Sequence, residues 1–179
     1  AKEIQYNKIL NILNASSNVK IHDQLKDIIV YTEDITYLKN KEKIFTQGST
    51  EVLIESKYDF KSKDTILLRN QQILSSSHKS IVKDDDDNVY NFENFLYFID
   101  KKILKGNDVK IVTNFNKEKS DQFIFSNGIF DLSTKKFSGK DTKILMHKNI
   151  FQKEKEKFLE LIEKTEINKI DKNKSTFEN

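Results

Sequence analysis

Apolar and polar residues alternate along almost the whole chain up to about residue 150. Two apolar residues separated by one position place their side chains on the same face of an extended strand. Such pairs are Ile4/Tyr6, Val19/Ile21, Ile28/Val30, Ile35/Tyr37, Val52/Ile54, Ile66/Leu68, Tyr97/Ile99, Val109/Ile111, Phe123/Phe125, Phe130/Leu132 and Ile144/Met146. Helical spacing is absent from the sequence until residue 151. The alternation therefore predicts antiparallel sheets with one dry face and one wet face.

Short polar segments separate these pairs and read as turns. They are KNKEK at 39–43, KSKD at 61–64, DDDDN at 84–88, DKK at 100–102, NKEKSD at 116–121 and STKK at 133–136. Polar turns at such short intervals predict a meander or roll of many short antiparallel strands.

The composition agrees with an all-β chain and excludes several classes of protein. Among 179 residues there are 31 Lys or Arg and 28 Asp or Glu, a net charge of +3, and Arg69 is the only arginine. This balance argues against a nucleic-acid partner, because Arg is the residue best suited to phosphate and guanine contacts. The absence of Cys excludes disulfides and thiolate metal sites. The first residues contain no apolar signal core, which fits a cytosolic protein, a mature secreted form or an excised piece.

Four segments of the sequence share one plan. Each begins with an aromatic residue, continues through a Lys-rich turn and a small residue, and ends in an apolar-x-apolar strand. The aromatic residues are Tyr6, Tyr37, Tyr97 and Phe130, and the small residue is Gly48, Gly106 or Gly139 in three of the copies. The recurrence predicts a bend that needs a positive φ, or the close passage of a neighbouring strand, more than a flexible loop. Self-similarity of this length indicates stacked units that bury their apolar faces on one another.

This plan, together with SKYDFKSKDTILLRN, NFLYFIDKKILKGNDVKI and SNGIFDLSTKKFSGKDTKI, resembles the OstA-like periplasmic domain of the lipopolysaccharide transport system. The likeness covers about residues 3–151. It is greatest to the N-terminal domain of the outer-membrane assembly protein, and next to the soluble periplasmic bridge protein. The resemblance implies an all-β fold, an open antiparallel β-jelly roll whose two sheets form a trough.

The same resemblance implies a function without covalent chemistry. The chain is expected to cradle the acyl chains of lipopolysaccharide in an apolar trough and to join a periplasmic bridge by strand addition. The expected location is the periplasm at the outer membrane, with lipopolysaccharide, other jelly-roll components and the outer-membrane assembly machinery as partners. An apolar slit with a wet rim suits acyl chains, and open sheet edges offer unpaired backbone groups to another strand.

The apolar residues that follow the small residue are the expected lipid contacts. They are Val19, Ile21, Val52, Ile54, Val109, Ile111, Ile144 and Met146. The expected strand-addition edges are marked by Ile4, Tyr6, Ile144 and Met146. Pattern alone favours the filling of a closed core, and only the resemblance favours lipid contact. The alternative function is therefore a structural or adhesive β-roll with a sealed core that binds a protein or glycan.

Other polar residues give no sign of catalysis. Lysines in the turns are placed to meet headgroup phosphates, although solvated turn charges are the commoner explanation. They are Lys39, Lys41, Lys43, Lys101, Lys102, Lys105, Lys135 and Lys136. Asp84–Asp87 does not fit a calcium loop, because Val89 and Phe95 occupy the Gly and Glu positions. His22, His78 and His147 lack metal-ligand spacing, and no nucleophile or phosphate-loop motif occurs. We expect no enzyme activity, cofactor or metal site.

The period changes near residue 152. Phe158, Leu161 and Ile162 fall at helical spacing, and Glu160 precedes Lys164 by one turn. We therefore expect a β-jelly roll over 1–151, followed over 152–179 by an amphipathic helix, about 152–166, and a disordered tail. The transmembrane barrel that follows this domain in the outer-membrane member of the family is not in the sequence. The chain is then either a soluble bridge member or a truncated or fused piece.

Overall fold

The computed structural model describes residues 1–115 and 120–147, which are all-β apart from a single 3₁₀ turn, Lys39–Lys41. Ala1–Leu145 form one compact unit, and Met146 begins a second. The strands are β1 (Glu3–Asn7), β2 (Ile12–Asp23), β3 (Ile28–Leu38), β4 (Lys43–Ile54), β5 (Tyr58–Lys63), β6 (Ile66–Leu68), β7 (Ile73–Ser76), β8 (Ser80–Lys83), β9 (Val89–Phe92), β10 (Asn94–Phe98), β11 (Ile103–Val112), β12 (Gln122–Asp131), β13 (Lys136–Lys140) and β14 (Lys143–Leu145). The expected C-terminal helix lies outside the described residues.

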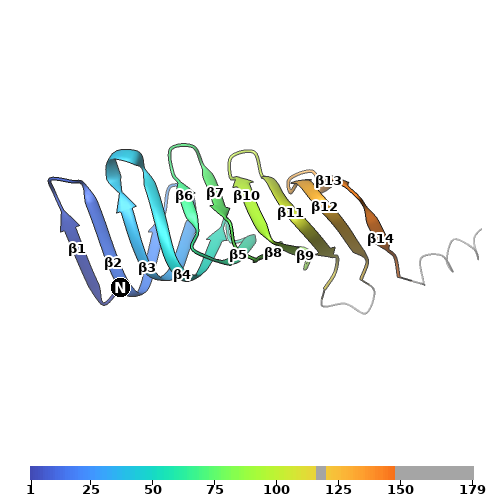
Figure 1. Ribbon diagram of the computed structural model, residues 1–179, viewed down its shortest axis with the longest axis horizontal. Coiled ribbons are helices and arrows are strands. Elements are labelled where there is room, and N and C mark those ends of the chain that lie inside the picture. The colour runs from blue at the N-terminus through green and yellow to red at the C-terminus, as the bar shows by residue number, and fades with distance from the viewer. Residues whose placement is uncertain (116–119, 148–179) are drawn as a thin grey trace, which may run out of the picture. The chain divides into compact units, whose positions relative to one another are not determined.

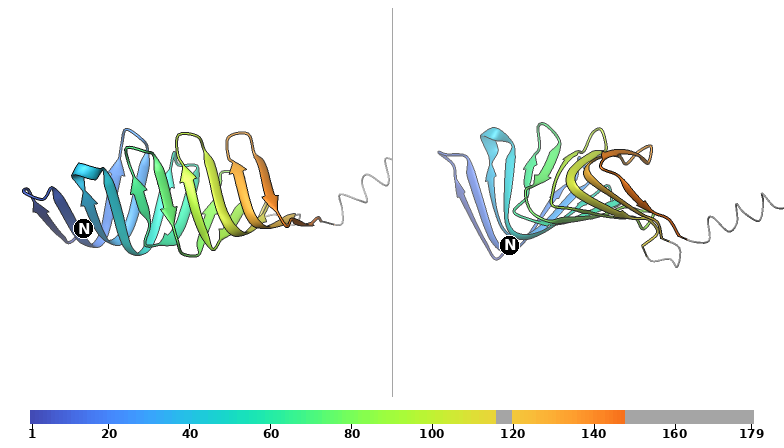
Figure 2. Two further views of the ribbon diagram at one scale, coloured as in Figure 1. Left: turned by 45° about the horizontal axis from the view of Figure 1, so that its top comes forward. Right: turned by 45° about the vertical axis from the view of Figure 1, so that its right-hand side comes forward.

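Each long strand bends near its middle and contributes to two sheets. β4 pairs with β6 through Lys43–Phe45 and with β5 through Ser49–Ile54. β11 divides in the same way between β10 and β9. We call the sheet that contains β1, β6, β7, β10 and β13 sheet I, and the sheet that contains β5, β8, β9 and β14 sheet II. The halves of β2, β3, β4, β11 and β12 complete both sheets, which diverge from a shared bend (Figures 1 and 2).

All pairings are antiparallel, and those from β4 to β11 form a closed ring. The ring closes because β4 and β11 belong to both sheets. β1, β2 and β3 extend the arrangement at its N-terminal end, and β12, β13 and β14 extend it at the other end. The all-β jelly roll predicted from the alternation and the family resemblance is thereby confirmed.

The chain crosses the bend repeatedly. Asn18, Gly48, Asp64, Asp108 and Asp141 lie on it with positive φ. Asn, Asp and Gly tolerate this left-handed conformation better than other residues, so the sequence can change direction here without a hairpin. The segment KSKD at 61–64 was therefore wrongly predicted as a turn. Its first three residues end β5 and Asp64 forms the bend before β6.

A chain of buried threonine hydroxyls satisfies polar groups at the bend. Thr50 Oγ1 donates to Thr46 Oγ1 at 2.7 Å, and Thr46 Oγ1 lies 2.9 Å from Thr65 Oγ1. The backbone N–H of Thr65, where the chain passes from β5 to β6, also donates to Thr46 Oγ1, at 2.7 Å. The strands can therefore break here without leaving a buried N–H unpaired.

The glycines of the repeated plan serve two different purposes. Gly48 lies at the bend with φ +82, where a Cβ would meet nothing nearer than 3.6 Å. Gly106 and Gly139 both pair with Gly128, so a row of glycines crosses β11, β12 and β13. A Cβ on Gly106 would lie 2.2 Å from Phe92 Cδ1, and one on Gly139 would lie 2.2 Å from Phe125 Cδ1. These two positions lack a side chain because aromatic rings pack directly on their backbone.

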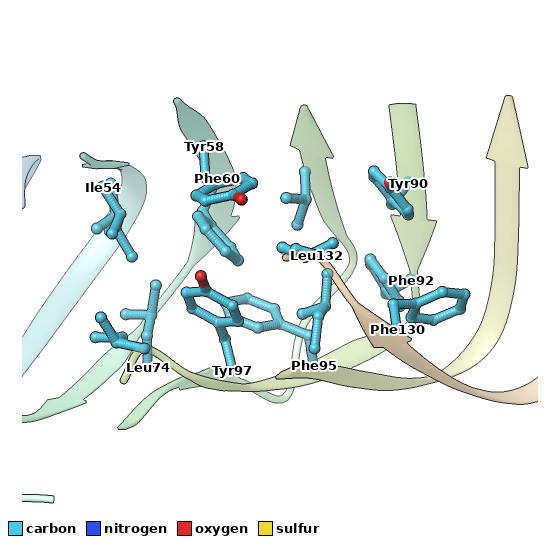
Figure 3. Close-up of a cluster of buried hydrophobic side chains, with 14 of the residues drawn as sticks. Ile54, Tyr58, Phe60, Leu74, Tyr90, Phe92, Phe95, Tyr97, Phe130 and Leu132 are labelled. Atoms are coloured by element: carbon cyan, nitrogen blue, oxygen red, sulfur yellow. The ribbon is translucent and has the colours of Figure 1, made fainter. Parts of the chain in front are cut away.

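The core lies between the two sheets and is rich in aromatic rings (Figure 3). Phe60 of sheet II lies 4.9 Å from Tyr97 and 5.4 Å from Phe95 of sheet I, measured between ring centroids. Phe92 and Phe130 continue this packing toward the C-terminal end at 5.8 Å. Tilted and edge-on rings pack the interior between β4 and β10. A cavity of about 200 Å³ lies beyond them, lined by residues that include Tyr90, Ile111 and Phe130.

Candidate functional site

A cleft of about 440 Å³ opens between the sheets at their N-terminal end. It forms because β1 extends only sheet I, where it pairs with Ile12–Ser16 of β2. Val19–Asp23 of β2 is therefore an edge of sheet II among the described strands. The cleft is lined by Leu13, Lys20, Ile21, His22, Asp23, Gln24, Leu25, Ile28, Val30, Ile35, Tyr37, Ile44, Leu67 and Arg69.

The apolar part of this lining suits an alkyl chain. Leu13, Ile35 and Ile44 come from sheet I, and Ile21 and Val30 face them from sheet II. The volume is about three times that of an apolar cavity of roughly 150 Å³ that holds one benzene molecule. Lys20, His22 and Gln24 supply polar groups in the same lining. The cleft therefore has the two properties that an amphiphile requires, an apolar wall and polar groups beside it.

A charged cluster around Arg69 ties the two sheets together at the cleft. Arg69 follows β6 in sheet I, and both its Nε and Nη2 donate to Asp23 Oδ2, at the end of β2 in sheet II, at 3.1 and 2.8 Å. Its Nη1 donates to Glu42 Oε2 at 2.7 Å and to Tyr37 Oη at 3.1 Å. Tyr37 Oη in turn donates to Glu42 Oε1 at 2.7 Å.

Protonation states in this cluster are set by its own contacts. The hydrogen bond to Asp23 raises the pKa of Arg69, so the guanidinium is charged at every physiological pH. Burial raises the pKa of Tyr37, and its bond to Glu42 acts in the same direction. Tyr37 is therefore a neutral phenol that donates to Glu42.

A second cavity, of about 130 Å³, adjoins the same cluster. It shares Asp23, Leu25, Ile28, Leu67 and Arg69 with the cleft and continues toward Gln72 and Ile99. The Arg69–Asp23 pair thus borders both cavities, and its side chains contribute to the boundary between them.

Two further ion pairs join the turns of sheet I to those of sheet II. Lys102 Nζ lies 2.7 Å from Glu55 Oε2, and Lys135 pairs with Asp86. With Arg69–Asp23 they form a row, which we call the seam pairs, along the side of the sheets opposite the bend. Two of the turn lysines considered for headgroup contact, Lys102 and Lys135, are therefore held by carboxylates of the chain itself.

The structure distributes the expected lipid contacts among three environments. Ile21 lines the cleft, and Val19 is buried beside it with Ala15 and Ile35. The remaining six positions lie elsewhere. Val52, Ile54, Val109 and Ile111 are fully buried in the packed core, whereas Ile144 and Met146 are about half exposed. Sequence reasoning missed Leu13, Ile44, Leu67 and Arg69 as cleft residues, although Leu13 and Ile44 carry an apolar signal.

The expected strand-addition residues lie at both ends of the sheets. Ile4 and Tyr6 belong to β1, which pairs only with β2 among the described strands. Ile144 belongs to β14, which pairs only with β12 in the same part of the chain, and Met146 follows it in the second unit. All residues of β1, β13 and β14 are exposed.

Two searches of the described residues concern metals and membranes. No group of three or more His, Asp or Glu side chains within 1–115 and 120–147 is arranged to hold a metal ion. No helix in this part of the chain is long and apolar enough to cross a bilayer.

Comparison with known proteins finds a similar structure but no match in sequence. No protein-family model matches the sequence, and no curated protein matches it. Among solved structures, the chain is similar to LptH of Pseudomonas aeruginosa, the LptA-homologous periplasmic component of the lipopolysaccharide transport device. The TM-score is 0.58 at 10% identity, over 71% of this chain and 99% of that one. The likeness shows a shared fold and confirms, at that level, the resemblance predicted from the sequence.

Proposed function

We propose that this chain is a non-enzymatic module of a periplasmic lipopolysaccharide transport bridge. It holds acyl chains in the N-terminal cleft and joins neighbouring modules through strand addition at its two ends. The observation that carries the proposal is that the apolar cleft opens where strand edges are unpaired within the described residues. A neighbouring module that continued both sheets would continue the apolar interior as well.

The physical chemistry of the cleft supports this role. Each methylene moved from water to an apolar wall gains about 0.8 kcal/mol, so an acyl chain is held without specific contacts. Non-directional contacts also let a chain slide, because no hydrogen bond must break at each step. The fold shared with LptH adds support, as does the predicted resemblance to the OstA-like domain. By this proposal the module works in the periplasm with the outer-membrane assembly machinery.

A second function, a structural or adhesive β-roll, is favoured by a different observation. Val52, Ile54, Val109 and Ile111 are at most 2% exposed and pack into the aromatic core. A fully packed interior is what a sealed roll requires. The two functions therefore differ in whether lipid enters the N-terminal cleft or enters no part of the interior.

Photo-crosslinking in cells that make lipopolysaccharide separates the two functions. A photoreactive residue at Ile21 samples the cleft, one at Ile54 samples the packed core, and one at exposed Lys110 samples the outer face. Lipopolysaccharide adducts from Ile21 and none from Lys110 are expected. Additional adducts from Ile54 would show that the packed interior opens to lipid. An absence of adducts from both Ile21 and Ile54, in a folded protein, would favour the sealed roll.

A further inference from the structure

Arg69 binds only one of the two carboxylate oxygens of Asp23. Both Nε and Nη2 donate to the same atom, Asp23 Oδ2. A guanidinium binds carboxylate or phosphate best when two parallel N–H groups each meet a separate oxygen. An incoming anion that offers one oxygen to each N–H would therefore fit this side of Arg69 better than Asp23 does.

The position of Arg69 makes such an exchange accessible from the cleft. The Arg69 side chain is 35% exposed, and it lines both the large cleft and the adjoining cavity. Leu67 and Ile28 are apolar neighbours in both linings. If an amphiphile bound its anionic headgroup to Arg69, its alkyl chain would thus lie against an apolar wall, in the cleft or in the adjoining cavity.

Asp23 and Glu42 give the cluster two carboxylates against one guanidinium. This excess of negative charge weakens the attraction for an incoming anion, so a bound anion is released readily. Reversibility suits a module that must release what it binds. Exchange at Asp23 would also remove one of the three seam pairs and the contact between sheets at the boundary of the two cavities.

We propose that Arg69 is the specificity-determining residue of the cleft, and that it binds the phosphate or carboxylate headgroup of an anionic amphiphile in exchange for Asp23. The proposal rests on the proposed function, because it assigns a headgroup site to the same cleft. It names the ligand class as an amphiphile with an anionic group next to its alkyl chain. Lys20 and His22 line the cleft too, but neither ties the two sheets together through a described contact.

The test measures binding of three probes to the full chain by calorimetry, below the critical micelle concentrations. Octyl phosphate carries the anionic headgroup, octyl glucoside has an uncharged one on the same chain, and inorganic phosphate has no chain. We expect the wild type to prefer octyl phosphate over octyl glucoside by about tenfold, the effect of a charge-assisted hydrogen bond. Arg69→Gln should abolish this preference, and Lys110→Gln on the outer face should leave it unchanged.

Asp23→Asn distinguishes anion binding by Arg69 from a merely structural role of the Arg69–Asp23 pair. It removes the competing charge and leaves Arg69 its contacts with Glu42 and Tyr37. Affinity for octyl phosphate should rise severalfold, while that for octyl glucoside stays constant.

A preference for octyl phosphate that persists in Arg69→Gln, or that does not rise in Asp23→Asn, would overturn the proposal. Binding of octyl glucoside would still support the cleft as a site for alkyl chains. Equal affinity for inorganic phosphate would indicate a free-phosphate site and overturn it too. Failure of both amphiphiles to bind would count against the proposed function itself.

Discussion

Single residues decide how closely an aromatic ring can approach the backbone of a strand, and Gly106 shows this most sharply. A Cβ there would lie 2.2 Å from Phe92 Cδ1 and 2.7 Å from the backbone O of Asn94. Since a backbone oxygen cannot move independently, we expect Gly106→Ala to lower the free energy of unfolding by about 1–3 kcal/mol in urea denaturation. Gly48→Asn is the control, because Asn tolerates the positive φ and the nearest atom is 3.6 Å away. Equal losses in both variants would contradict this explanation.

Tyr97 carries a hydroxyl that the core does not use. Its side chain is fully buried, and its Oη has no hydrogen-bond partner in the described structure. Burial raises the pKa of Tyr97, as expected for a phenol removed from water. We expect Tyr97→Phe to raise the free energy of unfolding by about 1 kcal/mol, because an unpaired buried polar group is removed.

Tyr90→Phe is the matched control for that measurement. Tyr90 is also buried, but its Oη donates to Asp84 Oδ2 at 2.9 Å. Removing this hydroxyl leaves Asp84 without one of its donors, so the free energy of unfolding should fall by about 1 kcal/mol. A loss of stability in Tyr97→Phe as well would show that the Tyr97 hydroxyl has a partner such as a buried water.

The stability of the turn after β12 depends on the protonation state of Asp131. Ser133 Oγ donates to its Oδ1 at 2.6 Å, and the Thr134 N–H donates to the same oxygen at 3.0 Å. These bonds lower the pKa of Asp131 to about 2. The native turn is thus favoured at pH values above the ordinary carboxyl pKa of about 3.9, and this preference is lost as the pH falls toward 2. Ser133→Ala should move the Asp131 pKa toward its ordinary value in an NMR titration, whereas an unchanged pKa would exclude the Ser133 bond as its cause.

At the scale of elements, the seam pairs hold turns of sheet I to turns of sheet II. Lys102→Glu should destabilise the fold by about 0.5–1 kcal/mol, because it places two carboxylates together in a partly exposed site. The double variant with Glu55→Lys should recover most of this loss in thermal denaturation, and high salt should reduce the difference. Charge reversal at Lys79, which pairs with Glu93 and is 82% exposed, should have almost no effect. Failure of the double variant to recover would indicate that packing, not charge, dominates at Lys102.

The elements also show what the sequence could and could not predict. Alternation located the strands, and the turns at 39–43, 84–88, 100–102 and 133–136 were predicted near their observed places. A bend with positive φ was predicted at Gly48 but missed at Asp64, because a left-handed Asp has the same local composition as a hairpin turn.

The cleft was harder to predict for two physical reasons. Alternation identifies the dry face of a strand but not whether another layer covers it, so Ile21 at the cleft and Ile54 in the core look alike. Arg69 was noticed only for its rarity. Its partner Asp23 lies 46 positions away in the sequence, and no local pattern links the two.

At the scale of the sheets as a whole, the middle is closed and the ends are open. β1 pairs only with β2 among the described strands and all of its residues are exposed, so its other side is open to a further strand. Proline has no N–H to donate and therefore interrupts the hydrogen bonding of a strand. If modules join through β1, the wild type should associate with rising concentration in sedimentation velocity, and Gln5→Pro should abolish this association. Gln5→Thr, which keeps the N–H, should preserve it.

Hydrogen exchange would locate the contact, with protection of β1 and β14 rising with concentration in the wild type but not in Gln5→Pro. Association that survives in Gln5→Pro, with no added protection of β1, would show that the modules meet through another surface.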